Sequence, residues 1–158
     1  MTVCSFFGHQ DSTGIDEIII YRVVKALMLQ GVDTFYVGNQ GRFDREVYKS
    51  LKRLKKIFPQ IHYSVVLAYP PGKRRRYELY DEGCTMYPEE VADGPARFAI
   101  DRRNRWPISK SDYCVCYINH TWGNAYKYAM MARRCAVTVI NLGRAELRVP
   151  DNPTIGFV

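Results

Sequence analysis

The sequence predicts an α/β protein with a Rossmann-like three-layer α/β/α fold, in which a mostly parallel five-stranded sheet lies between two layers of helices. Two observations predict it. Short apolar runs of strand length alternate with longer segments whose apolar residues recur every three or four positions. Polar turns that contain glycine follow the first, second and fourth apolar runs. Strands that alternate with helices form parallel sheets with both faces covered, and their crossovers are right-handed. We therefore expect the strand order 3-2-1-4-5.

The first half of the chain supplies three of these strands and two helices. Gly14 to Gly31 reads as the first helix, because a capping box formed by Thr13 and Asp16 precedes its apolar positions. The second helix begins with Asp44 as a candidate N-cap, and Pro59 ends it. The expected strands are residues 2–7, 33–37 and 61–69.

The second half begins with a long irregular segment, residues 70–94, which is rich in Pro, Gly, Tyr and Arg. Loops of this length inside a compact domain are usually functional or disordered. A helix is expected over 96–105, with Pro107 disturbing its end. The remaining elements are expected to be a strand at 113–118, a helix at 124–134, a strand at 136–141 and a C-terminal tail at 142–158.

Composition narrows the class of protein. The length of 158 residues favours one domain, residues 1–158. No apolar run approaches the ~18 residues that span a bilayer, and the N-terminus does not resemble a signal peptide. The five cysteines lack paired zinc spacing, so we expect buried thiols in the cytoplasm, no metal and no cofactor. The net charge of +7 favours anionic partners, and its excess gathers at residues 49–56 and in the loop Lys73–Arg76.

The candidate site follows from the expected topology. Ligands of open parallel sheets bind beyond the carboxyl ends of the strands, at the point where the winding reverses. Three loops meet there, at residues 8–14, 38–44 and 119–124. Their glycines and the start of a helix suit an anion such as a phosphate. The residues expected to bind a ligand are Gly8, His9, Gln10, Gly38, Gly41, Phe43, Asp44, Arg103, Asn104, His120, Thr121, Trp122, Gly123 and Asn124.

Several of these residues have a structural alternative. Asp44 accepts ribose hydroxyls or caps a helix. His9 and His120 contact a ligand, act as acid or base, or are ordinary loop residues, and nothing in the sequence fixes a catalytic partner beside them. Trp122 stacks on a base or packs under the sheet edge. Arg103 binds a phosphate or lies on a solvated helix face.

Four motifs in the same order resemble the YpsA-like branch of the SLOG superfamily, which is related to the DNA-processing Smf/DprA proteins and the cytokinin-activating LOG enzymes. They lie at residues 2–11, at 38–44, at 103–104 with 108–114, and at 122–125 with 128–129 and 139–141. The resemblance covers the chain to about Leu142. It implies a Rossmann-like fold, a pocket for a nucleotide or nucleotide derivative, and a cytoplasmic bacterial or phage protein.

The chain departs from this family at three points. Gln10 stands where arginine is usual, and Asn124 stands where a second glycine would be. The hydrolase branch carries a glutamate for N-glycosidic cleavage, whereas Lys127 and Tyr128 occupy that neighbourhood here. The resemblance thus favours a binding module over an enzyme.

Three functions are expected in order of preference. The first is binding of a nucleotide or nucleotide-derived small molecule, in a sensor or signalling module that can be a homo-oligomer. The second is N-glycosidic hydrolysis of nucleoside monophosphates, for which Asp11, Asp44 and Asp112 are the candidate carboxylates. The third is nucleic-acid binding through the basic loop Lys73–Arg76, with Tyr77 and Tyr80 for stacking.

Overall fold

The computed structural model describes residues 1–9, 14–70, 80 and 83–147. Its sheet has six strands, all parallel, in the order β4-β3-β2-β1-β5-β6. The first strand therefore lies between β2 and β5, where the direction of winding reverses. The strands are β1 (Val3–Gly8), β2 (Thr34–Val37), β3 (His62–Val66), β4 (Thr85–Met86), β5 (Tyr113–Tyr117) and β6 (Thr138–Asn141).

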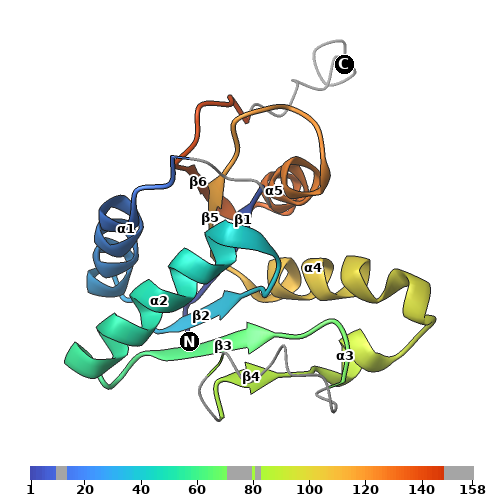
Figure 1. The fold of residues 1–158 in the computed structure, drawn as a ribbon, viewed down its shortest axis with the longest axis horizontal. Coiled ribbons are helices and arrows are strands. Elements are labelled where there is room, and N and C mark those ends of the chain that lie inside the picture. The colour runs from blue at the N-terminus through green and yellow to red at the C-terminus, as the bar shows by residue number, and fades with distance from the viewer. Residues whose placement is uncertain (10–13, 71–79, 81–82, 148–158) are drawn as a thin grey trace, which may run out of the picture.

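Helices cover both faces of the sheet, which gives the three layers of a Rossmann-like fold (Figure 1). One face carries α1 (Glu17–Leu29) and α2 (Gly41–Ile57), which pack on each other. The other face carries α4 (Ala99–Lys110) and α5 (Asn124–Arg134). Two short helical turns, α3 (Glu89–Ala92) and the 3₁₀ turn η2 (Ala96–Phe98), lead into α4.

The alternation of side chains along the central strands divides the core into two clusters. Phe6 of β1 and Val115 of β5 face α1 and α2, whereas Phe7 and Cys114 face α4 and α5. Successive side chains of a strand point to opposite faces, so a continuous apolar run is buried on both. The strand β1, which is paired on both edges, is the most enclosed part of the sheet.

The predicted order of five strands is confirmed, and one strand was missed. Thr85–Met86 forms β4 within the segment 70–94, which was expected to be irregular, and α3 also lies there. A two-residue strand has no alternating pattern to detect. It exists because β3 offers a free edge, to which Cys84 and Met86 supply carbonyl acceptors.

Two helix boundaries differ from those expected. α1 begins at Glu17, with the Asp16 carboxylate accepting a hydrogen bond from the Ile18 N–H, so the expected start near Gly14 was wrong. α4 continues through Pro107 to Lys110, although Pro107 was expected to disturb its end. Proline removes one helical hydrogen bond, and the buried packing of Pro107 and Ile108 offsets that cost.

Some expectations fall outside the described residues: the capping residue Thr13, the basic loop Lys73–Arg76, and the tail beyond Leu147. Among the helices that the structure describes, none is both long and apolar enough to cross a membrane.

Candidate functional site

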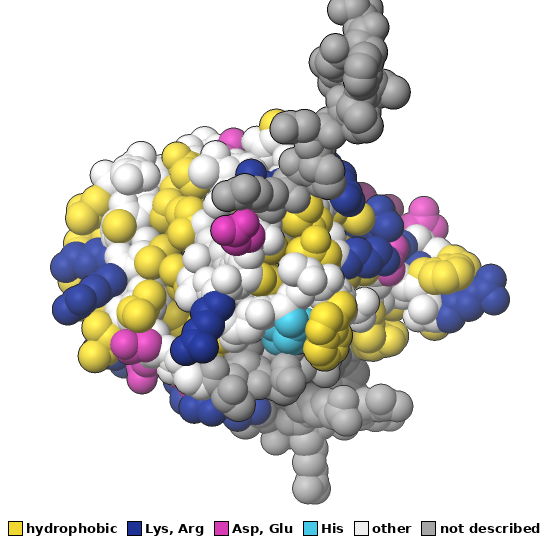
Figure 2. Space-filling model, turned by 90° about the horizontal axis from the view of Figure 1, so that it is seen from above, with side chains coloured by type: hydrophobic (Ala, Val, Ile, Leu, Met, Phe, Trp, Pro, Cys, Tyr) yellow, Lys and Arg dark blue, Asp and Glu magenta, His cyan; other side chains and the backbone are white. Residues whose placement is uncertain are grey.

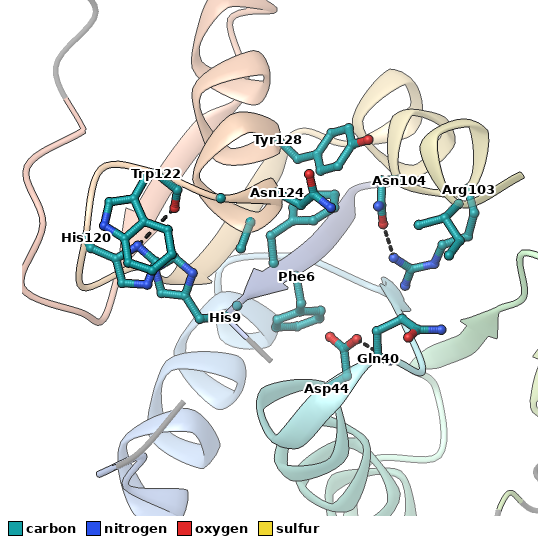
Figure 3. A pocket seen from close by; sticks show the side chains of 15 residues that line it. Phe6, His9, Gln40, Asp44, Arg103, Asn104, His120, Trp122, Asn124 and Tyr128 are labelled. Atoms are coloured by element: carbon teal, nitrogen blue, oxygen red, sulfur yellow. Dashed lines mark hydrogen bonds between the residues drawn. The ribbon is translucent and has the colours of Figure 1, made fainter. Parts of the chain in front are cut away.

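A pocket of about 340 Å³ opens at the carboxyl edge of the sheet, where β1 and β5 lie side by side (Figure 3). Four segments enclose it: the end of β1, the β2–α2 turn, the middle of α4, and the β5–α5 turn with the start of α5. The lining residues are Phe6, Phe7, Gly8, His9, Gln40, Asp44, Ile100, Arg103, Asn104, His120, Trp122, Gly123, Asn124, Ala125 and Tyr128.

The β5–α5 turn brings the start of a helix to this pocket. Gly123 is the N-cap residue of α5 and has a φ of 92°, a conformation that L side chains rarely adopt. Its carbonyl accepts the first helical hydrogen bond, from the Lys127 N–H. The N–H groups before Lys127 have no partner within the helix, and Gly123 has no side chain to cap them. Two of these, on Asn124 and Ala125, belong to residues that line the pocket.

Arg103 supplies a positive charge from the opposite wall. Its side chain is only 4% exposed, so it does not lie on a solvated helix face, and that alternative is wrong. The guanidinium donates hydrogen bonds to the Val66 carbonyl, at 3.1 Å, and to the side chain of Asn104. Burial lowers the pKa of Arg103, although an arginine stays protonated in proteins. A fixed, buried cation in a pocket attracts an anionic group.

Asp44 lies near that charge. Burial raises the pKa of its carboxyl to about 6, and both Arg103 and the Gln40 N–H oppose the rise. The alternative that Asp44 is an N-cap is wrong, because α2 begins at Gly41, with Gln40 as its N-cap. Asp44 instead accepts a hydrogen bond from the Gln40 N–H at 2.9 Å.

Gly38 explains how these two charged groups come together. A β-carbon at this position would collide with the Arg103 guanidinium and the Asp44 carboxylate. Gly38 is therefore required because the side chains of Arg103 and Asp44 occupy the space of a β-carbon, and not because of a turn. It does not line the pocket itself.

Three aromatic rings form a stack at the other end of the pocket (Figure 3). His120 lies between His9 and Trp122, and its ring centroid is 3.6 Å from each of the two neighbours, with interplanar angles of 17°. His120 Nδ1 also lies 2.9 Å from the carbonyl oxygen of Trp122. This stack joins the β1 loop to the β5–α5 turn. Trp122 is 68% exposed and does not pack under the sheet edge.

Tyr128 completes the wall on the side of α5. Its hydroxyl donates a hydrogen bond to the Asp101 carboxylate of α4, and Asp101 also accepts one from Arg105 at 2.7 Å. Burial, followed by this hydrogen bond, raises the pKa of Tyr128 to about 12. The tyrosine thus stays neutral near pH 7, and its position depends on Asp101.

The structure gathers nine of the fourteen predicted residues around the pocket, and their role in binding stays a prediction. Of the others, Gly38, Gly41, Phe43 and Thr121 do not line it. Gly41 has a φ of 91° and begins α2, and Phe43 packs in the core. Gln10 lies outside the described residues.

Gly8 also has a packing role that the sequence did not indicate. It lies at the end of β1, and a β-carbon there would collide with the ring of Phe43. The absence of a side chain therefore permits close packing of α2 on β1. The backbone of Gly8 still forms part of the pocket wall.

Sequence reasoning missed six lining residues: Phe6, Phe7, Gln40, Ile100, Ala125 and Tyr128. Phe6 and Phe7 were predicted to lie in the core, and they do belong to its two clusters, although both also border the pocket. Gln40 could have been predicted, because it lies in the strand-to-helix turn that was already expected at the site. Ile100 and Tyr128 could not, because their position at the pocket depends on how α4 packs against α5.

The carboxylates proposed for hydrolysis are dispersed. Asp112 precedes β5 and accepts a hydrogen bond from the Val3 N–H at 2.9 Å, so it lies at the opposite, amino edge of the sheet. Asp11 lies outside the described residues. Among the described lining residues, Asp44 is the one carboxylate.

Within the described ranges, no group of three or more His, Cys, Asp or Glu side chains is placed to hold a metal ion. Cys4, Cys84, Cys114 and Cys116 are buried and form no disulfide bonds. Burial raises the pKa of the Cys114 thiol to about 12, so it is protonated and unreactive near pH 7.

Viewed from above, the described surface shows Lys and Arg side chains in separate groups among hydrophobic and neutral side chains (Figure 2). A histidine lies next to hydrophobic side chains on this face. On the described part of this face the Lys and Arg side chains do not form one continuous patch.

The described fold is a parallel, Rossmann-like α/β domain with a pocket at its winding-reversal point. No model of a known protein family matches the chain, and no curated protein matches it.

Proposed function

We propose that this protein binds a nucleotide or a nucleotide-derived small molecule in the pocket between β1 and β5, as a nucleotide-binding module of the YpsA-like branch of the SLOG superfamily. The observation that carries the proposal is the meeting of two anion-attracting features in one cavity. These are the uncapped N–H groups at the start of α5 and the buried guanidinium of Arg103.

The start of α5 suits the phosphate. Its first N–H groups carry the positive end of the helix dipole, and backbone amides with glycine at the cap allow close approach of a phosphate oxygen. Among the described residues, only the His120 ring edge lies within 4 Å of the position of a Gly123 β-carbon, at 3.8 Å, so these residues leave the space over the helix start open.

The opposite end suits hydroxyl groups. Asp44 accepts hydrogen bonds, and Gln40, Asn104 and Arg103 offer further donors in the same wall. A ribose carries hydroxyls that pair with such groups. A nucleotide therefore satisfies both the anionic and the polar part of the pocket.

Titration calorimetry with a panel of AMP, ADP-ribose and cyclic nucleotides tests the proposal. We expect at least one ligand to bind with a Kd below 1 mM, and Gly123→Asp to weaken it at least about tenfold, because a carboxylate would then face the phosphate. Gly31→Asp is the matched control, since Gly31 also has a positive φ, of 105°, and does not line the pocket. Absence of binding at millimolar concentrations, in the unaltered protein and Gly123→Asp alike, would contradict the proposal.

N-glycosidic hydrolysis is a second candidate, favoured by one observation. Asp44 is a buried carboxyl in the pocket with a pKa near 6, which is suited to proton transfer close to neutral pH. Release of free base from nucleoside monophosphates, lost in Asp44→Asn, would support hydrolysis. Recovery of the intact nucleotide after prolonged incubation would rule it out.

A further inference from the structure

We infer that the uncovered face of the Trp122 indole stacks on the nucleobase of the ligand, so that the pocket selects nucleotides over sugar phosphates that lack a base. This deepens the proposed function and rests on it. Trp122 would bind the nucleobase, which the residues proposed for the phosphate and for the hydroxyl groups do not contact.

The first observation is the exposure of this side chain. Trp122 is 68% exposed, although tryptophan is usually well buried, and it lines the pocket. Covering an aromatic ring of this size with another ring removes much apolar surface from water and adds favourable stacking. An exposed tryptophan at the edge of a cavity therefore gains most from an aromatic ligand.

The second observation is that the ring is held in place. One face of the indole is covered by His120, whose other face is covered by His9, and His9 is buried at the end of β1. The exposed surface of Trp122 is consequently its opposite face and its edge. A ring that is already ordered loses little side-chain entropy when a ligand binds.

The third observation is the layout of the pocket. Figure 3 places the aromatic stack at one end, and Asp44, Gln40 and Arg103 at the other, with Asn124 and the start of α5 between them. ADP-ribose, which carries a ribose on each side of its diphosphate, has this order of parts if its adenine and the adjoining ribose lie on Trp122, its diphosphate on the α5 amides and its second ribose toward Asp44. A sugar phosphate without a base leaves the tryptophan uncovered.

A single-tryptophan protein reports on this contact directly. The chain has two tryptophans, and Trp106→Phe leaves Trp122 as the only one. The Trp106 indole N–H is buried without a hydrogen-bond partner among the described residues, so phenylalanine there loses no hydrogen bond. This variant is titrated with the four nucleoside monophosphates, ADP-ribose and ribose 5-phosphate, following tryptophan fluorescence and, separately, the heat of binding.

We expect a nucleotide to quench the fluorescence of Trp122 and ribose 5-phosphate not to quench it. Trp122→Ala should weaken the nucleotide by about tenfold or more, which is typical of a lost base stack, and leave the affinity for ribose 5-phosphate unchanged. Trp122→Phe should restore most of the affinity. Phe98→Ala is the matched control, because Phe98 is also an exposed aromatic residue, at 51%, but lies outside the pocket lining.

The outcomes separate this inference from the proposed function. Nucleotide binding that neither quenches Trp122 nor weakens in Trp122→Ala would overturn the stacking and leave nucleotide binding intact. Equal loss of nucleotide and ribose 5-phosphate in Trp122→Ala would also overturn it, because the side chain would then support the phosphate site. Absence of binding by every compound would overturn both.

Discussion

Asp44 shows how one buried residue links stability to the chemistry of the pocket. Its carboxylate is 7% exposed and accepts one backbone hydrogen bond, while Arg103 stands nearby. The loss of solvation outweighs the attraction of the guanidinium, so the folded protein holds the Asp44 proton with a pKa near 6, against 3.8 for an ordinary aspartate. Ionised Asp44 therefore costs folding free energy at neutral pH.

The raised pKa of Asp44 predicts how the stability of the protein changes with pH. Because the folded pKa lies above the unfolded one, the free energy of unfolding should be greatest near pH 4 and fall as the pH rises through 6, by about 3 kcal/mol for a shift of two pKa units. Asp44→Asn should remove this fall and be more stable than the unaltered protein at pH 8. Urea unfolding at pH 4 to 8 measures both curves, and an unchanged slope in Asp44→Asn would contradict the assignment.

Two other aspartates affect stability at more acidic pH. A hydrogen bond from the Thr34 side chain lowers the pKa of Asp33, and one from the Tyr128 side chain lowers the pKa of Asp101. Their stabilisation is present above pH 4 and lost as the pH falls further. These aspartates affect stability below about pH 4, and Asp44 affects it above that pH. The difference in the free energy of unfolding between the unaltered protein and Asp44→Asn above pH 4 therefore reports on Asp44 alone.

At the scale of elements, the β5–α5 turn is held by a connection from β6. Asn141, the last residue of β6, donates to the carbonyls of Ile118 and Ala145 and accepts from the N–H groups of Ile118 and Gly143. Gly143 passes so close to the backbone of Ile118 that a β-carbon would collide with it. These contacts place the start of the turn that carries His120 and Trp122, so a residue outside the pocket positions the site.

Asn141→Ala should therefore be costly. Four hydrogen bonds are lost and partly buried groups are left unpaired, at about 1 kcal/mol for each bond, so we expect a loss of about 2–4 kcal/mol in the free energy of unfolding. Asn119→Ala is the control in the same region, since its side chain accepts a single exposed hydrogen bond from the Arg144 N–H. Equal stability losses in the two variants, measured by urea unfolding, would show that the Asn141 contacts do not hold the turn.

At the scale of the whole molecule, the pocket exists because the winding reverses beside β1. The chain leaves β1 toward β2 on one side and returns to β5 on the other, so the helices that follow these strands diverge and leave a space above the sheet edge. Segments more than a hundred residues apart meet there, as the contact of His9 with His120 shows. A ligand bound in this space would touch both halves of the sheet.

Prediction from sequence succeeded where the pattern is local. Val3–Gly8 and Tyr113–Tyr117 are apolar runs bounded by turn residues, and α5 begins at Asn124 as expected, directly after Gly123. The Gly38–Asp44 turn was located correctly, and of its predicted residues Asp44 lines the pocket whereas Gly38, Gly41 and Phe43 do not. Only packing reveals that Gly38 makes room for Arg103 and that Gly8 makes room for Phe43.

The amino-acid sequence by itself determined the class of fold, the order of its five main strands and the three loops that surround the candidate site, because these follow from the spacing of apolar residues and from the chirality of parallel crossovers. Tertiary structure alone decided that Arg103 is buried, that Trp122 is exposed on a stack with two histidines, and that β4 adds to the edge of β3. Those features depend on contacts between residues far apart in the chain, which no local pattern encodes.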